Sequence, residues 1–194
     1  MNGYKKRTEQ KKASILKSAR VLFNQNGIDE TKIIEIAKIA EVSPVSIYNY
    51  FNSKEGLLRA LIEEELDKSI QMYNDILDSN MPFEKKLDNI MNLKNYHLTK
   101  NNNIFFTAKT GDSKRINKIY EDIMNYKGKK VYMHFIKVGK NEGYINENID
   151  NQALLDFMMQ SFQIMSQDSY KSNSADYKKD LLSLFLYGIL DYKK

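Results

Sequence analysis

The sequence predicts an all-α protein. Apolar residues recur mostly at three- and four-residue spacing, the period of an amphipathic helix, and the alternating runs typical of strands are nearly absent. Only two prolines and eight glycines occur among the 194 residues, so long helices meet few breakers. The hydrophobic share of 42% is ordinary for a globular protein and is sufficient for a buried core.

The first predicted helix spans residues 8–26. Its apolar side chains recur on one face: Ile15, Ala19, Leu22 and Phe23. Gly27 follows directly and is expected to stop the helix, because glycine readily adopts the left-handed conformation that ends many helices.

A short second helix is predicted over residues 32–40, with Thr31 as its N-cap. A tight turn at residues 41–43 should follow. Ser43 can then cap a third helix, and Pro44 suits its first turn because the missing N–H group has no helical partner there.

A long fourth helix is expected to begin at Asn52 or Ser53 and to reach about residue 79, before Pro82. The later helices are predicted at residues 83–100, 104–109, 113–140, 151–169 and 175–192, with a polar break over residues 141–150. We therefore divide the chain into an N-terminal three-helix domain, residues 1–52, and a C-terminal helical domain, residues 53–194.

The positive charge is concentrated near the N-terminus. Residues 1–54 contain ten Lys and Arg against five Asp and Glu, which accounts for the whole net charge of +5. A basic domain on a neutral body suggests that the N-terminal domain binds a polyanion, although a merely soluble basic segment has the same composition. The stretch "YKKRTEQKK" could likewise follow phosphates or reach into a minor groove, or be a solvated tail.

The third helix, "PVSIYNYF", has two distinct faces. On a helical wheel Phe51 lies about 40° from Ile47, so both should face the core, while Asn49 lies roughly 200° away. Two short helices joined by a tight turn form a helix-turn-helix, whose second helix fits the major groove of DNA.

The polar face of this helix carries suitable chemistry. Asn49 can form paired hydrogen bonds with adenine, and Val45 can contact a thymine methyl group. Ser46 is a permissive donor and acceptor, and tyrosine hydroxyls at positions 48 and 50 can donate to phosphates. Alternatively, Tyr48 and Tyr50 cover the core, and Tyr50 is the more structural of the two. At the flanks, Thr31, Lys32 and Lys54 could hold phosphates.

Residues 15–61 resemble the N-terminal domain of the TetR (tetracycline-repressor-like) family of bacterial transcriptional regulators. The resemblance lies in the stretches "ARVLFNQNG", "TKIIEIAKIAEVS" and above all "YNYFNSKEGLL". It implies that DNA contacts fall on Thr31, Lys32, Ser43, Pro44, Val45, Ser46, Tyr48, Asn49, Tyr50 and Lys54. The sequence departs from the family at Glu41, where glycine is common in the turn, so we expect a left-handed, slightly strained residue there.

The resemblance also implies a homodimer formed by the last two helices, and an effector pocket among the middle ones. The last two helices are apolar around most of their circumference, which favours an interface but also suits a core helix. The candidate interface residues are Leu155, Phe162, Leu182, Phe185, Leu186 and Ile189. The candidate pocket residues, each of which could equally be core, are His97, Phe105, Phe106, Tyr120, Met124 and Phe157.

These observations predict a ligand-responsive regulator, most simply a repressor, that binds a palindromic operator as a homodimer and is released by a small, largely apolar effector. An activator, or a regulator whose N-terminal domain binds a protein, is the alternative. The abundance of Lys, Asn, Ile and Tyr indicates a low-GC genome and hence an AT-rich operator.

Other functional classes find little support. The chain has no cysteine and only two histidines, His97 and His134, and we find none of the common nucleotide-binding, metalloprotease or hydrolase motifs. We therefore expect neither an enzyme nor a cofactor or metal. Without a signal sequence or a sufficiently long apolar segment, we expect a soluble cytoplasmic protein that does not bind membranes.

Overall fold

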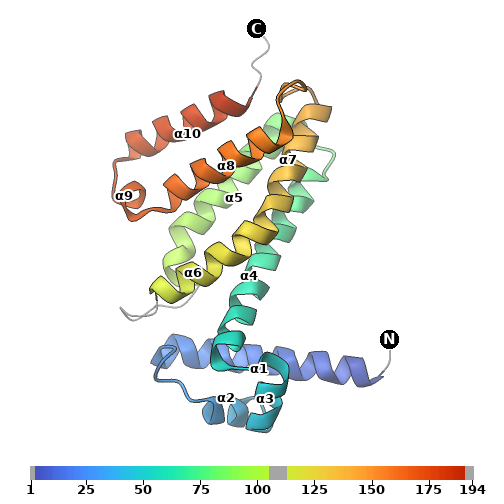
Figure 1. Ribbon diagram of the computed structural model, residues 1–194, viewed down its shortest axis with the longest axis vertical. Helices are drawn as coiled ribbons and strands as arrows, with labels where there is room; N and C mark the ends of the chain where they lie inside the picture. Colours follow the sequence, from blue (N-terminus) through green and yellow to red (C-terminus); the bar gives the residue numbers. More distant parts are fainter. Residues whose placement is uncertain (1–2, 105–112, 191–194) are drawn as a thin grey trace. The chain divides into compact units, whose positions relative to one another are not determined.

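The computed structural model describes residues 3–104 and 113–190, and this part of the chain is helical with no strand, which confirms the all-α prediction (Figure 1). The elements are α1 (Gly3–Asn26), α2 (Ile33–Ile39), α3 (Pro44–Phe51), α4 (Lys54–Leu77), α5 (Phe83–Ile104), α6 (Ser113–Ile123), the π-helical turn η1 (Met124–Gly128), α7 (Lys129–Asn141), α8 (Asn151–Ser166), α9 (Asp168–Lys171) and α10 (Ala175–Ile189).

The helices belong to two compact units. The first unit comprises Met1–Ser69 and Asn92–Ile123, and the second comprises Ile70–Met91 and Met124–Lys194. The division therefore falls inside α4 and α5, which each contribute to both units. The predicted boundary between a DNA-binding domain, residues 1–52, and a C-terminal domain, residues 53–194, divides the chain by function and stays a prediction.

In the first unit, α1 packs against α2 and α3 through a fully buried face that includes Ile15, Ala19 and Phe23. Gly27 has a φ of 89°, so it ends α1 in the expected left-handed conformation. The predicted cap of α2 was wrong by one residue. Lys32 is the N-cap, and the hydroxyl of Thr31 donates instead to the carbonyl oxygens of Leu22 and Gly27.

The turn between α2 and α3 has the predicted conformation. Glu41 has a φ of 55°, a left-handed backbone for a residue other than glycine. Ser43 accepts a hydrogen bond from the backbone N–H of Ser46, and Pro44 is the first residue of α3, which confirms both predictions. The left-handed backbone at Glu41 lets the chain reverse within three residues, so α3 starts directly beside α2.

A second left-handed residue ends α3. Asn52 has a φ of 63°, and Ser53 then caps α4 by accepting from the backbone N–H of Gly56 at 2.9 Å. The fourth helix consequently begins at Lys54. A Cβ atom at Gly56 would lie 1.9 Å from the carbonyl oxygen of Phe51, so only glycine allows this close approach of α3 and α4.

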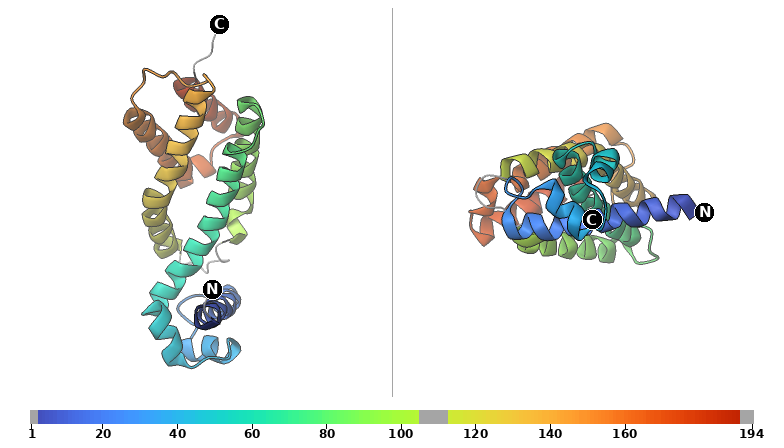
Figure 2. Two further views of the ribbon diagram at one scale, coloured as in Figure 1. Left: turned by 90° about the vertical axis from the view of Figure 1, so that its right-hand side faces the viewer. Right: turned by 90° about the horizontal axis from the view of Figure 1, so that it is seen from below.

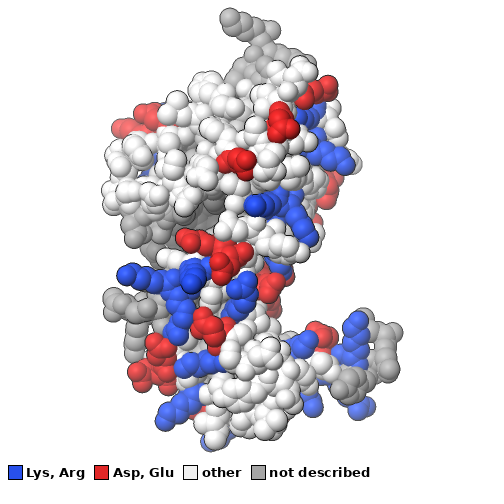
Figure 3. Space-filling view, in the orientation of Figure 1, with Lys and Arg blue, Asp and Glu red and all other residues white. Residues whose placement is uncertain are grey.

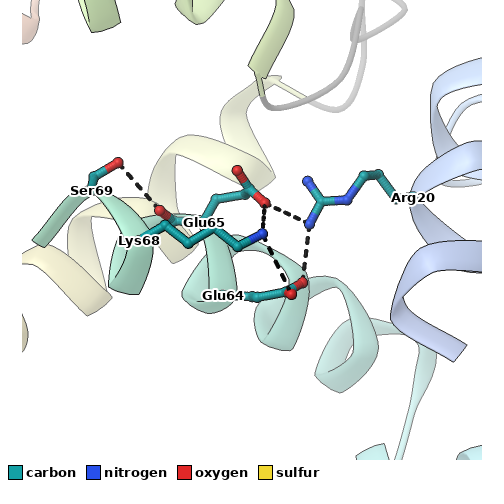
Figure 4. A network of polar contacts seen from close by, with 5 residues as sticks. All are labelled: Arg20, Glu64, Glu65, Lys68 and Ser69. Carbon is teal, nitrogen blue, oxygen red and sulfur yellow. Dashed lines mark hydrogen bonds and ion pairs between the residues drawn. The ribbon is translucent and has the colours of Figure 1, made fainter. Parts of the chain in front are cut away.

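An ion-pair network joins α1 to α4 in the first unit (Figure 4). The Arg20 guanidinium lies 3.1 Å from Glu64 and 2.7 Å from Glu65, and Lys68 lies 2.9 Å from Glu65. The hydrogen bond to Glu65 raises the pKa of Lys68. The network joins α1 to α4 through side chains that remain in contact with water. We therefore expect each ion pair alone to contribute little to the free energy of unfolding.

The second unit has a core built by α4, α5, α7, α8 and α10. Phe83 lies at its centre, 1% exposed, tilted against Phe135 and stacked on Tyr144 with ring centroids 4.7 Å apart. A Cβ atom at Gly139 would meet Ile145 at 2.6 Å, so this glycine lets α7 approach the following loop closely.

Several predicted helices differ from the observed ones. The first helix begins at Gly3, five residues before the predicted start, and α5 continues to Ile104, past the predicted end at residue 100. The single helix at residues 113–140 is interrupted by η1, and Gly128 is buried at that turn, where a Cβ atom would meet the Met124 side chain at 2.8 Å. The helix at 151–169 ends at Ser166, because Gln167 is extended, and α10 ends at Ile189. The helix at 104–109 lies outside the described residues apart from Ile104, the end of α5.

Candidate nucleic-acid interface

The helix α3 presents a polar and an apolar face as its sequence predicts. Ile47 is 0% and Phe51 is 9% exposed, and both pack inward. On the opposite side Val45 is 64% and Tyr48 49% exposed, and Asn49 is also exposed. The helix-turn-helix interpretation required Asn49 and its neighbours to be accessible, and they are.

The start of α3 is held by its own side chains. The hydroxyl groups of Ser43 and Ser46 lie 2.9 Å apart, and both are hydrogen-bonded within this first turn. Pro44 is half-buried beside them. Ser43 and Pro44 therefore fix the entry of the chain into α3, and Ser46 must exchange a local hydrogen bond to contact a base.

Tyr50 lies between the core and the surface. Its ring meets the ring of Phe51 edge-on at 6.4 Å, and the Lys12 ammonium lies 6.0 Å from its centroid. The side chain is half-buried. Tyr50 thus partly covers the core, while the Tyr48 side chain points toward solvent.

The flanking candidates are engaged in holding the loop between α1 and α2. Thr31 is 1% exposed, so only its backbone could contact a ligand. The Lys54 ammonium donates to the carbonyl oxygens of Asp29 and Thr31, each at 3.0 Å. Lys32 is exposed, but its backbone N–H donates to the Glu35 carboxylate at 3.0 Å. The sequence did not predict that these groups form hydrogen bonds within the fold.

Arg115 is a positioning residue that sequence reasoning missed. Its guanidinium on α6 lies 2.7 Å from Asp29 in the same loop and 3.8 Å from Glu55 on α4. The hydrogen bond from Arg115, reinforced by its charge, holds the pKa of Asp29 below its ordinary value of 3.8. No local sequence signal links positions 29 and 115, because the contact arises only when α6 packs on this unit.

Charged side chains surround α3 but are absent from it. The helix contains no Lys, Arg, Asp or Glu, and Figure 3 shows an uncharged area at its position with Lys and Arg side chains nearby. Exposed cations on α1 and at α2 include Lys5, Lys11, Lys38 and Lys32, the N-cap of α2. A neutral helix flanked by cations is the arrangement expected if α3 contacts bases and the surrounding lysines contact phosphates.

The candidate effector residues do not form a site in the described part of the chain. Phe105 and Phe106 lie outside it, and the His97 side chain is not described. Burial raises the pKa of the Tyr120 phenol, and Met124 is half-buried in η1. Phe157 is 42% exposed and stacks on Phe185 with centroids 6.0 Å apart, so it belongs to the surface of α8 and α10.

Open grooves of about 740 and 400 Å³ lie on the first unit, and none of the effector candidates lines either groove. His134 contacts Asn74 at 3.1 Å and Asp78 at 3.0 Å. Among the described residues there is no group of three potential metal ligands. In the same residues, every helix is too short or too polar to traverse a bilayer.

The candidate dimer residues divide into two groups. Leu155 and Ile189 are 5% and 2% exposed and belong to the core of the second unit, so they are not available to a partner. Leu182, Phe185 and Leu186 are half-buried, and the Phe162 side chain is not described. The outward apolar positions on α8 and α10 are instead Phe157, Ile164, Tyr177, Leu184 and Tyr187, at 42%, 43%, 42%, 67% and 66% exposure.

Comparison with known proteins agrees with this geometry. Residues 15–61 match the family model described as bacterial regulatory proteins, tetR family. The HTH-type transcriptional regulator UidR of Escherichia coli (strain K12) is 30% identical over 64 residues, which is 33% of each chain. The chain thus matches about a third of the length of this relative.

Solved structures extend the similarity of fold to nearly the whole chain. A regulator from Mesorhizobium loti MAFF303099, described as a putative TetR-family protein, has a TM-score of 0.65 at 15% identity, with 94% of this chain and 96% of that one covered. FadR from Bacillus subtilis, solved in complex with stearoyl-CoA, has a TM-score of 0.56 at 18% identity, with 91% and 98% covered.

Proposed function

Because residues 15–61 match the tetR family model and the fold is that of TetR-family structures, we propose that the protein is a transcriptional repressor that binds a palindromic, AT-rich operator as a homodimer in the cytoplasm. The observation that carries the proposal is the orientation of α3: Ile47 and Phe51 anchor it in the core while Val45, Tyr48 and Asn49 face outward. A helix of this length, neutral and presented on a basic unit, suits the major groove.

Each outward residue has a distinct contact in this proposal. Asn49 forms paired hydrogen bonds with an adenine, and Val45 packs on a thymine methyl group. The Tyr48 hydroxyl donates to a phosphate oxygen and sets the position of α3 along the groove. Ser46 contributes a hydrogen bond once it leaves Ser43.

The dimer part of the proposal is supported by the apolar surface of α8 and α10. Leu184 and Tyr187 are each about two-thirds exposed, an unusual state for two large side chains one turn apart, at 67% and 66%. A second copy would cover them. Two α3 helices about 34–36 Å apart then contact consecutive major grooves, which requires a palindrome.

Release by a small, largely apolar effector completes the proposal. Support comes from FadR of Bacillus subtilis, which has this fold and was solved with stearoyl-CoA. The helix α4 follows α3 directly and contributes to both compact units, so a ligand that favours one position of α4 changes how α3 is presented. The ligand can shift the equilibrium only by its difference in affinity between the two states.

Selection from a randomised duplex library tests the proposal. The expected product is an inverted repeat, and its affinity should fall steeply with rising KCl through counterion release. Failure to enrich any duplex at low salt would refute DNA binding and leave a protein partner as the target of α3. Enrichment of a single, unrepeated site would refute the palindrome while keeping DNA as the ligand.

A further inference from the structure

The first half of α1 carries a basic surface that the helix-turn-helix does not use. In the first unit this part of α1 extends past α2 and α3, as Figure 1 and the right-hand view of Figure 2 show. Among the side chains of α1 whose burial is described, the first buried one is Ile15, so the described side chains of residues 5–13 cover no core of their own. At 1.5 Å per residue this extension is about 16 Å long.

The extension is helical and fixed relative to α3. The Ser14 hydroxyl donates to the Ala40 carbonyl oxygen at the end of α2. Two residues earlier, the Lys12 ammonium lies 6.0 Å from the ring centroid of Tyr50, near the end of α3. Since the preceding residues continue the same helix, they are held in a defined direction instead of forming a loose tail.

The cations of the extension are unevenly distributed around the helix. Lys5 and Lys11 lie within about 80° of Ile15 on the helical wheel, on the side that further along packs on α2 and α3. Lys6 and Lys17 lie roughly 160–180° away from Ile15. Lys5 and Lys11 are exposed and have no ion pair with another described residue. On this side of α1, the buried apolar face ends at Ile15, and Lys5 and Lys11 form a basic stripe before it.

This stripe lies at the height of the DNA backbone if α3 occupies a groove. The major groove is about 8.5 Å deep, and packed helices lie about 8–10 Å apart, so the phosphate walls beside α3 rise to the level of α1. We infer that the N-terminal half of α1 is a second DNA-binding element, which lies across the sugar–phosphate backbone outside the half-site and contacts phosphates through Lys5 and Lys11. This inference rests on the proposed function of α3.

The contact is expected to be independent of base sequence. Lysine ammonium groups neutralise phosphates and release counterions, and they read no base. The element should therefore strengthen binding to every duplex equally. It should also protect the DNA backbone from hydroxyl-radical cleavage beyond the bases that α3 contacts.

A pair of charge-matched variants of the full chain tests the inference. Lys5→Gln/Lys11→Gln removes the stripe, and Lys6→Gln/Lys17→Gln removes two charges from the opposite face of the same helix. Binding of each to the selected duplex and to a scrambled duplex is measured against KCl concentration, with helicity followed by circular dichroism. Hydroxyl-radical footprints are compared at saturation.

In the proposed dimer the first variant removes two charges from each protomer, so it should lower the slope of log affinity against log salt by about 4 and weaken binding to both duplexes by roughly 1000-fold or more at 0.1 M salt. It should also lose protection outside the half-sites, while the control variant stays close to wild type. Equal slopes for the two variants would overturn the inference although α3 still binds its site. If the wild-type protein binds neither duplex, the proposed function fails and the inference falls with it.

Discussion

Lys86 Nζ lies 2.7 Å from Glu142 Oε1, and the lysine side chain is 7% exposed whereas the glutamate is 33% exposed. Lys86 belongs to α5, and Glu142 is the C-cap of α7. The ammonium therefore pairs with a carboxylate carried by the residue that ends α7. This pair is the most buried ion pair in the described part of the second unit.

Removal of the carboxylate should leave a buried charge without its partner. We expect Glu142→Ala to lower the free energy of unfolding by about 2 kcal/mol, below the usual cost of a fully buried pair because Glu142 keeps contact with water. The control is Asp88→Ala, which breaks an exposed pair with Lys85 at 3.8 Å and should change stability by less than about 0.5 kcal/mol. Urea unfolding measures both. Equal effects would mean that burial of Lys86 carries no penalty.

Asn49 and Ile47 lie on opposite faces of α3 and should respond oppositely to substitution. Asn49→Ala should weaken operator binding by about 1–3 kcal/mol and leave the melting temperature unchanged. Ile47→Ala should destabilise the protein by roughly 2–5 kcal/mol, because it opens a cavity at a fully buried position. Fluorescence anisotropy and thermal unfolding separate the two effects. Wild-type affinity of the Asn49 variant would show that this face does not contact bases.

Gly56 should tolerate no side chain. Gly56→Ala places a Cβ atom 1.9 Å from the Phe51 carbonyl oxygen, a backbone atom that cannot move away alone. We expect a loss of roughly 2–4 kcal/mol in unfolding free energy. Gly3→Ala is the control, since its Cβ atom would meet nothing within 4 Å and alanine favours the helix. The prediction fails if the two variants unfold at the same urea concentration.

The Asp29–Arg115 pair should make stability depend on acid pH. The folded-state pKa of Asp29 is lowered, so its contribution is present above the ordinary carboxyl value of 3.8 and is lost as pH falls through the folded value. Asp29→Asn should therefore reduce stability at neutral pH and have little effect near pH 2. Arg115→Gln should restore the ordinary pKa of Asp29 in an NMR titration. A wild-type carboxyl that titrates at its ordinary value would disprove the pairing in solution.

The exposed surface of α8 and α10 should control association. Leu184→Glu/Tyr187→Glu is expected to convert the proposed dimer into monomers in light scattering, because two charges cannot be buried in an apolar interface without partners. Met72→Glu, at a 49% exposed position on α4, is the control and should leave the mass unchanged. A dimeric double variant would place the interface elsewhere.

Local physics allowed the α2–α3 region to be predicted in detail. Ser43 is a favoured N-cap and Pro44 suits the first helical turn, the spacing of Ile47 and Phe51 selects the buried face, and Glu41 must reverse the chain between two helices. Each of these features depends on neighbours within a few residues. The structure therefore agreed with the prediction there, apart from the cap of α2.

The sequence by itself thus determined the helical class, the helix-turn-helix and the face of α3 that meets solvent. Only the tertiary structure decided that Lys54 holds the carbonyls of Asp29 and Thr31, that Arg115 secures the same loop, and that Ile189 is core while Leu184 is surface. The reason is physical: helical periodicity fixes which side chains share a face, but the packing of distant elements fixes what that face meets.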